Sequence, residues 1–143
     1  MLFSTSRRIS ARLAAKSFRN VRASHAQSQL NAVTEQDIAH LSKILPSSSI
    51  ITTLSPISMS STELDPFNQD WMGKYKGNAS TVLKPKTTQE LSDIVKWCNE
   101  KRIGIVPQGG NTGLVGGSVP IGDEVIISLA NMNQVRSFDP ISG

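Results

Sequence analysis

The chain has 143 residues and a net charge of +4, and this length suits one domain with a modest core. Six of its fifteen Lys and Arg residues precede Glu35, the first acidic residue. The rest of the chain contains nine Lys and Arg and eleven Asp and Glu, so its net charge is −2. Nucleic-acid binding needs several cations together on a folded surface, so this distribution argues against such a partner.

Residues 1–30 are predicted to form a mitochondrial transit peptide. The segment contains no acidic residue and is amphipathic on a helical wheel, with basic and apolar arcs side by side. These properties suit the mitochondrial import machinery, so we expect a mitochondrial protein, with the matrix as its compartment. The alternative is a disordered basic tail, whereas the missing apolar run disfavours a secretory signal. No stretch approaches the roughly 20 apolar residues of a transmembrane helix. The basic arc holds Arg8, Arg12, Lys16, Arg19 and Arg22, and the apolar arc holds Leu2, Phe3, Ile9 and Leu13.

Residues 31–65 are predicted to form a short helix and then a Ser/Thr-rich connector. The hydroxyl of Thr34 precedes acidic residues and suits a helix start, and Pro46 ends the helix. From Ser47 onward the apolar residues are irregular, which indicates a connector rather than a core element. The apolar positions at helical spacing are Ile38, Leu41 and Leu45.

Residues 66–143 show an α/β pattern. A short strand at 81–83 leads to a capping box, Thr87 to Glu90, and the following helix leads to a strand at 103–106. This is a βαβ unit, whose strands are expected to be parallel. A further strand is predicted at 125–129. The helix is expected to turn one apolar stripe toward the sheet: Leu91, Ile94, Val95 and Cys98.

Few residues point to nucleophilic or metal chemistry. Cys98 is the only cysteine, so no intramolecular disulfide can form, and it is interpreted as a core residue. His25 and His40 have no partner at ligand spacing. We therefore predict no metal site and no Ser/His/Asp site in this chain.

A glycine-rich loop separates the second and third predicted strands. Five of the ten glycines fall within nine positions, and Lys and Arg are absent between Gly109 and Ser118. Glycine allows positive φ and lets bare backbone amides approach a ligand, so the loop can hold an anionic pyrophosphate through N–H groups. The G-x-G-x-x-G and P-loop spacings are both absent. From spacing alone, a glycine-rich hairpin or Ω-loop without a ligand remains the alternative.

Four ordered motifs give the chain a resemblance to a known family. They run from Asn68 to Gly77, from Val82 to Thr87, from Val106 to Pro120 and from Asp123 to Leu129. Together they resemble the FAD-linked D-2-hydroxyglutarate and D-lactate dehydrogenases, which are vanillyl-alcohol-oxidase-like flavoproteins. The likeness covers residues 66–143.

The resemblance implies an α/β (α+β) fold, the first subdomain of a PCMH/VAO-type FAD-binding domain, of which 66–143 would be a part. It implies that the loop wraps the FAD pyrophosphate and that Pro85 lies near the adenine, although Pro85 also suits a simple strand stop. The residues expected to bind FAD are Pro85, Gly109, Gly110, Asn111, Thr112, Gly113, Leu114, Gly116, Gly117 and Ser118.

The family oxidises a D-2-hydroxy acid to the 2-oxo acid, and its base, arginines and metal-binding histidines come from later segments. We therefore expect an N-terminal fragment that has no catalytic residue of its own and binds FAD weakly at best. The alternatives are a non-catalytic FAD- or nucleotide-binding remnant and an unstable truncated product. The sequence does not distinguish D-lactate from D-2-hydroxyglutarate.

Overall fold

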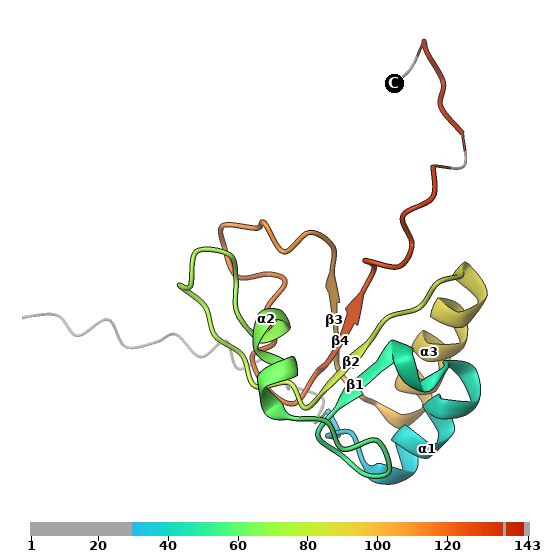
Figure 1. Ribbon diagram of the computed structural model, residues 1–143, viewed down its shortest axis with the longest axis vertical. Coiled ribbons are helices and arrows are strands. Elements are labelled where there is room, and N and C mark those ends of the chain that lie inside the picture. The colour runs from blue at the N-terminus through green and yellow to red at the C-terminus, as the bar shows by residue number, and fades with distance from the viewer. Residues whose placement is uncertain (1–29, 136, 142–143) are drawn as a thin grey trace, which may run out of the picture.

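The computed structural model describes residues 30–135 and 137–141, so the predicted leader lies outside the described residues apart from Leu30. The structure has a mixed α/β architecture with one four-stranded sheet (Figure 1). Its elements are α1 Glu35–Ile44, the 3₁₀ turn η1 Ser47–Ser49, β1 Ile50–Thr52, the 3₁₀ turn η2 Ser61–Glu63, α2 Asp65–Asn68, β2 Thr81–Leu83, α3 Thr88–Lys101, β3 Ile105–Gln108 and β4 Val125–Ser128.

Both long helices begin where the sequence predicts. Thr34 caps α1 and Thr87 caps α3, and in each case a carboxylate three residues later returns a hydrogen bond to the cap backbone. These capping boxes satisfy amides that lack partners within the helix. Helix α3 ends at Lys101, and its C-cap Arg102 has a φ of 55°, in the left-handed region.

The sheet has the order β1-β2-β4-β3. Strands β2, β4 and β3 are parallel, and β1 is an outermost strand that runs antiparallel to β2. The predicted βαβ unit is therefore confirmed as parallel, but β4 lies between its two strands. The predicted strand at 103–106 is shifted, because β3 begins at Ile105 and Ile103 forms only an isolated bridge with Asn31.

The prediction of a connector after Ser47 was wrong for β1. Ile50 and Thr52 are fully buried, and the Thr52 hydroxyl lies 3.0 Å from that of Thr81 on the neighbouring strand. The strand is only three residues long, so its pattern is too short to show a period. The boundary placed between residues 65 and 66 stays a prediction.

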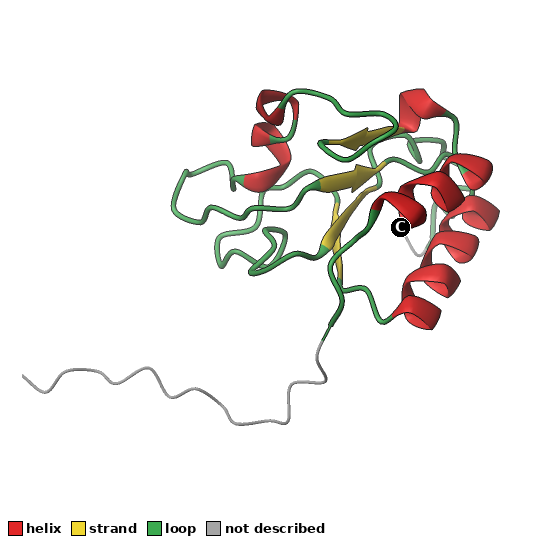
Figure 2. Ribbon diagram, turned by 90° about the horizontal axis from the view of Figure 1, so that it is seen from below, coloured by secondary structure: helices red, strands yellow, loops and turns green. Residues whose placement is uncertain are grey.

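Side chains alternate between the two faces of the sheet, and each face has its own core. Helices α1 and α3 cover one face, while α2 lies on the other (Figure 2). On strand β4, Val125 and Ile127 join the helical core, whereas Ile126 packs with Leu64 on the opposite side. Because β4 is buried on both faces, it lies at the centre of the molecule.

The predicted apolar stripe of α3 was wrong at one position. Ile94 and Cys98 are fully buried and Leu91 packs against the core, but Val95 is 43% exposed. Trp97 packs against the core and contacts α1 instead, where its ring stacks on His40 at 3.6 Å. The stripe is rotated because the helix faces α1 as well as the sheet. The interpretation of Cys98 as a core residue is confirmed.

Candidate functional site

The candidate site lies where the parallel strands end. The carboxyl ends of β2, β4 and β3 meet at one edge, which is where open α/β sheets commonly bind ligands. The glycine-rich loop follows β3 directly, and the buried Pro85 comes two residues after β2. The segment after β4 is tied to this edge by Asn131, which donates to the Lys84 carbonyl at 3.1 Å. The structure thus places Pro85 and the loop on the same edge, with β4 between their strands.

Gln108 anchors the start of the loop. The residue is 3% exposed, and its side-chain amide donates to two carbonyls, that of Phe67 at 2.9 Å and that of Ser118 at 3.0 Å. The two ends of the loop are therefore drawn together beside α2. Gln108 is not among the residues predicted from the sequence, although a polar residue at the end of an apolar strand is a usable signal.

Asn111 and Ser118 shape the loop from within. The Ser118 hydroxyl donates to Oδ1 of Asn111 at 2.6 Å, and Nδ2 of Asn111 donates to the carbonyl of Gln69 at 2.7 Å. Asn111 has a φ of 54°, a conformation that asparagine tolerates better than most residues. Both residues were predicted to bind FAD. Here they bind one another, and a ligand contact stays a prediction.

The glycines of the loop are of two kinds. Gly116 is required by the fold, because its φ is +74° and an added Cβ would lie 2.7 Å from Cγ of Tyr75. Gly109, Gly113 and Gly117 do not have positive φ, and an added Cβ would meet nothing within 4 Å. The space beside these three glycines is therefore open, and no contact within the described residues requires them to be glycine.

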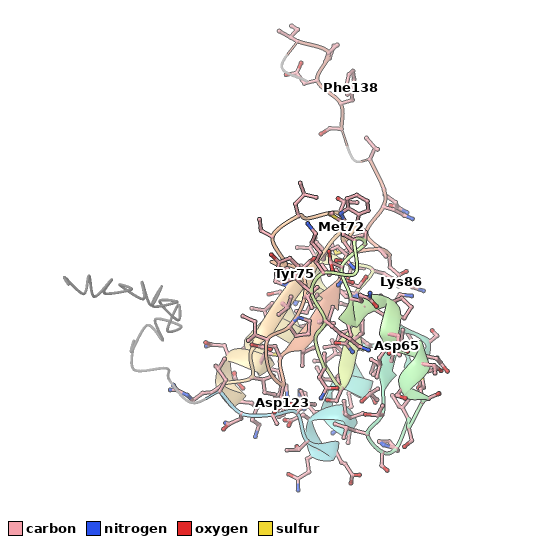
Figure 3. All side chains as sticks on the ribbon, turned by 90° about the vertical axis from the view of Figure 1, so that its left-hand side faces the viewer. Asp65, Met72, Tyr75, Lys86, Asp123 and Phe138 are labelled. Atoms are coloured by element: carbon pink, nitrogen blue, oxygen red, sulfur yellow. The ribbon has the colours of Figure 1, made fainter. Side chains whose placement is uncertain are left out.

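Exposed apolar side chains occur on the glycine-rich loop and on its neighbouring loop. Leu114 and Val115 are 62% and 82% exposed, and Trp71 on the neighbouring loop is 62% exposed. In Figure 3, Met72 and Tyr75 lie near one another, away from Asp123, which precedes β4. The site combines bare backbone, no Lys or Arg between Gly109 and Ser118, and apolar neighbours. Such a surface suits a pyrophosphate held by amides and joined to flat aromatic groups.

The remaining reactive side chains lie elsewhere. Burial in the helical core, and then the charge of Asp37, raises the pKa of Cys98 from 9.0 to about 11, so its thiol stays protonated near neutral pH. No group of three His, Cys, Asp or Glu among residues 30–135 and 137–141 could hold a metal ion. Within the same residues, no helix is long and apolar enough to span a membrane.

Comparison with known proteins identifies the class of domain to which this fold corresponds. Residues 79–143 match the model of an FAD binding domain. The substrate-bound crystal structure of p-cresol methylhydroxylase matches with a TM-score of 0.58 at 25% identity, over 76% of this chain and 21% of that chain. Alkyldihydroxyacetonephosphate synthase matches with a TM-score of 0.57 at 18% identity, over 79% of this chain and 23% of that one, which supports the fold alone. The chain therefore has the fold of a PCMH-type FAD-binding domain.

Proteins of similar sequence form a narrower group within this class of domain. A Schizosaccharomyces pombe protein provisionally named a mitochondrial D-lactate dehydrogenase is 44% identical over 88% of this chain and 24% of its own length. The D-2-hydroxyglutarate–pyruvate transhydrogenase of Saccharomyces cerevisiae is 49% identical over 76% of this chain and 21% of its own. The mitochondrial D-2-hydroxyglutarate dehydrogenase of Arabidopsis thaliana is 42% identical over 79% of this chain and 19% of its own.

The chain is similar to the family of FAD-linked D-2-hydroxyglutarate and D-lactate dehydrogenases, the resemblance that its motifs predict. FAD is the cofactor of this family. The chain spans about a fifth to a quarter of the length of these curated relatives.

Proposed function

We propose that the glycine-rich loop holds the pyrophosphate of FAD through its backbone amides, as part of an enzyme that oxidises a D-2-hydroxy acid to the 2-oxo acid. The observation that carries the proposal is the open space beside Gly109, Gly113 and Gly117. The proposed binding residues are those carried over from the family motif: Pro85, Gly109, Gly110, Asn111, Thr112, Gly113, Leu114, Gly116, Gly117 and Ser118.

Physical chemistry supports this use of the loop. An anion that lies among converging N–H groups needs no cationic side chain, and the loop offers none between Gly109 and Ser118. Three glycines that the fold does not require leave room for phosphate oxygens close to the backbone. Backbone amides of the glycine-rich loop would hold FAD by its pyrophosphate, and the bound cofactor would supply the two-electron oxidation.

The test is a pair of matched glycine substitutions. Gly113→Val fills the open space with a side chain, and Gly122→Val makes the same change outside the motif, where a Cβ would meet only Glu124 at 3.7 Å. We expect both variants to unfold within about 0.5 kcal/mol of the wild type in urea, because neither position is crowded. We expect Gly113→Val to weaken FAD binding at least about tenfold, as lost amide contacts of about 1.4 kcal/mol would do.

Equilibrium dialysis against FAD measures this difference. The unaltered chain should bind FAD weakly, since about a fifth of the relatives' length supplies only part of a cofactor site. No detectable FAD binding by the unaltered chain would overturn the proposal. Equal affinity in the two valine variants would show that the loop is not the cradle.

We further propose that these 143 residues alone have no dehydrogenase activity. The chain contributes a cofactor loop, and the groups that bind and deprotonate the hydroxy acid are expected elsewhere in the longer relatives. Dye reduction with D-lactate and with D-2-hydroxyglutarate should stay at the level of a buffer control. Measurable turnover with either acid would contradict the proposal.

The proposed location is the mitochondrial matrix, reached through residues 1–30. The support is the basic, acid-free composition of this segment and the mitochondrial names of several relatives. A fusion of residues 1–30 to a fluorescent protein should enter mitochondria. The same fusion with its six basic residues changed to Gln should remain cytosolic, and identical location of the two would contradict the targeting role.

A further inference from the structure

A second loop, Gln69–Gly77, lies alongside the glycine-rich loop (Figure 1). It follows α2 and is separated from the glycine-rich loop by more than thirty residues of sequence. Its three large apolar side chains are exposed: Trp71, Met72 and Tyr75. Exposed aromatic side chains on a loop gain little from burial, so their positions call for another explanation.

Buried polar side chains fix the shape of this second loop. Asp70 is 4% exposed, and its carboxylate accepts from the backbone N–H of Tyr75 at 2.7 Å and from that of Met72 at 3.2 Å. At the base of the loop, Asn68 accepts from the N–H of Ala79 at 2.7 Å and donates to its carbonyl at 3.0 Å. The second loop is therefore ordered by its own hydrogen bonds.

The ordered loop contacts the glycine-rich loop at three points. The Trp71 indole N–H donates to the carbonyl of Thr112 at 3.1 Å. The Gln69 carbonyl accepts from Asn111 at 2.7 Å, and the Tyr75 ring lies so close to Gly116 that an added Cβ would be 2.7 Å from its Cγ. These contacts are distributed along residues 111–116. They therefore restrain the backbone of the whole stretch and not only one of its ends.

The Trp71 contact also sets the direction of an amide. A trans peptide bond is planar, with its carbonyl and its N–H on opposite sides. Because the Thr112 carbonyl points at the Trp71 indole, the N–H of the next residue, Gly113, points in the opposite direction, away from that indole. Gly113 is one of the three glycines beside open space, so its amide donor is oriented before any ligand arrives.

We propose that Gln69–Gly77 holds the glycine-rich loop in its cofactor-binding conformation, with Trp71 and Tyr75 as positioning residues. The inference rests on the proposed function for its ligand, but the restraint itself is independent of FAD. Asp70 supports both residues by ordering the loop that carries them.

The chain provides a matched control, because it has two tryptophans and both indoles donate one hydrogen bond. Trp71→Phe removes the donor to Thr112. Trp97→Phe removes the donor to Asp37, on the helical side of the molecule. A second pair of variants distinguishes the contribution of the Tyr75 ring from that of its hydroxyl. Tyr75→Leu removes the ring beside Gly116, whereas Tyr75→Phe keeps the ring and removes the hydroxyl.

Hydrogen–deuterium exchange of peptides covering residues 109–118, measured without FAD, reports the restraint. We expect Trp71→Phe and Tyr75→Leu to exchange about 2- to 10-fold faster there, the range that corresponds to one lost hydrogen bond. Tyr75→Phe should match the wild type. Trp97→Phe should lower the urea midpoint but leave loop exchange unchanged.

FAD affinity, measured by equilibrium dialysis on the same variants, should fall by a similar factor in Trp71→Phe and Tyr75→Leu only. Unchanged loop exchange in Trp71→Phe, or equal acceleration in Trp97→Phe, would overturn the inference. Faster exchange with unaltered FAD affinity would overturn the positioning role. If the wild type binds no FAD, the proposed function fails, and the exchange data alone decide whether the second loop restrains the first.

Discussion

The two tryptophans of this chain show how differently its two sides are built. On the helical side, Trp97 is partly buried, stacks on His40, lies 4.8 Å from the Lys101 ammonium and donates to Asp37. On the loop side, Trp71 is 62% exposed and donates to a backbone carbonyl.

The same side chain therefore stabilises packing in one region and sets backbone conformation in the other. The helical side has a filled core in which α1 and α3 cover one face of the sheet. The loop side keeps space open beside three glycines, and hydrogen bonds rather than burial determine its shape. A cofactor loop needs such a division, because a filled surface cannot admit a ligand.

The largest loss of stability is expected from a substitution of Asp37, which accepts several hydrogen bonds on the helical side. Its carboxylate accepts from the N–H of Thr34 at 2.9 Å, from its hydroxyl at 2.6 Å and from the Trp97 indole. Asp37→Ala leaves these donors without their acceptor, so we expect the free energy of unfolding to fall by about 2–4 kcal/mol. Urea denaturation measures this loss. Asp93→Ala, which removes an exposed partner of Gln89, should cost less than about 0.5 kcal/mol, and equal losses would contradict the comparison.

Gly116→Ala should have the next largest effect and is the counterpart on the loop side. The added methyl group meets the Tyr75 ring at 2.7 Å, and alanine at a φ of +74° is strained. We expect a loss of about 1–3 kcal/mol in unfolding free energy. Gly113→Ala should change stability by less than about 0.5 kcal/mol, since its Cβ meets nothing. If both variants lost the same stability, the division of the glycines into two kinds would be wrong.

A smaller effect is expected at Thr87, the cap of the helix that joins the two sides. Helix α3 starts near the carboxyl edge of the sheet and packs along α1. Thr87→Ala removes the side-chain acceptor for the N–H of Glu90, so stability should fall by about 1 kcal/mol. Thr87→Ser keeps the hydroxyl and should be close to wild type by thermal denaturation. A serine variant as unstable as the alanine variant would assign the loss to packing instead of capping.

The thiol of Cys98 is expected to leave the stability independent of pH near neutral pH. Its folded pKa of about 11 lies above the ordinary value of 9.0, so the folded state favours the protonated form. This contribution to stability is complete below pH 9 and is lost as the pH rises toward 11. A thiol reagent at pH 8 should therefore modify Cys98 only as fast as the protein unfolds. Rapid labelling under native conditions would show that the helical side is less closed than its packing indicates.

Local signals in the sequence predicted the helices well. The starts of α1 and α3 were predicted correctly from the cap at Thr34, the capping box at Thr87 and the spacing of apolar residues, because a cap and a helical turn involve residues at most four apart. The glycine run likewise marks the candidate loop. Residue types and spacing suffice for these features, since each depends on near neighbours along the chain.

Pairings between distant segments were not predictable in the same way. The three residues of β1 carry too little pattern to reveal a strand, and the position of β4 between β2 and β3 leaves no local trace. Val95 is exposed and Trp97 packs against the core because α1 lies beside α3, which the pattern of α3 alone cannot show.

For the candidate site, the sequence by itself determined the glycine-rich loop, its lack of Lys and Arg, and its likeness to a flavoprotein motif. Only the tertiary structure decided which glycines the fold requires, because Gly116 is distinguished by Tyr75, forty-one residues earlier. It also brought Trp71 to Thr112, a contact of the same separation. Such contacts form when packing brings remote segments together, so their physical cause lies in the closed fold and not in any local stretch of chain.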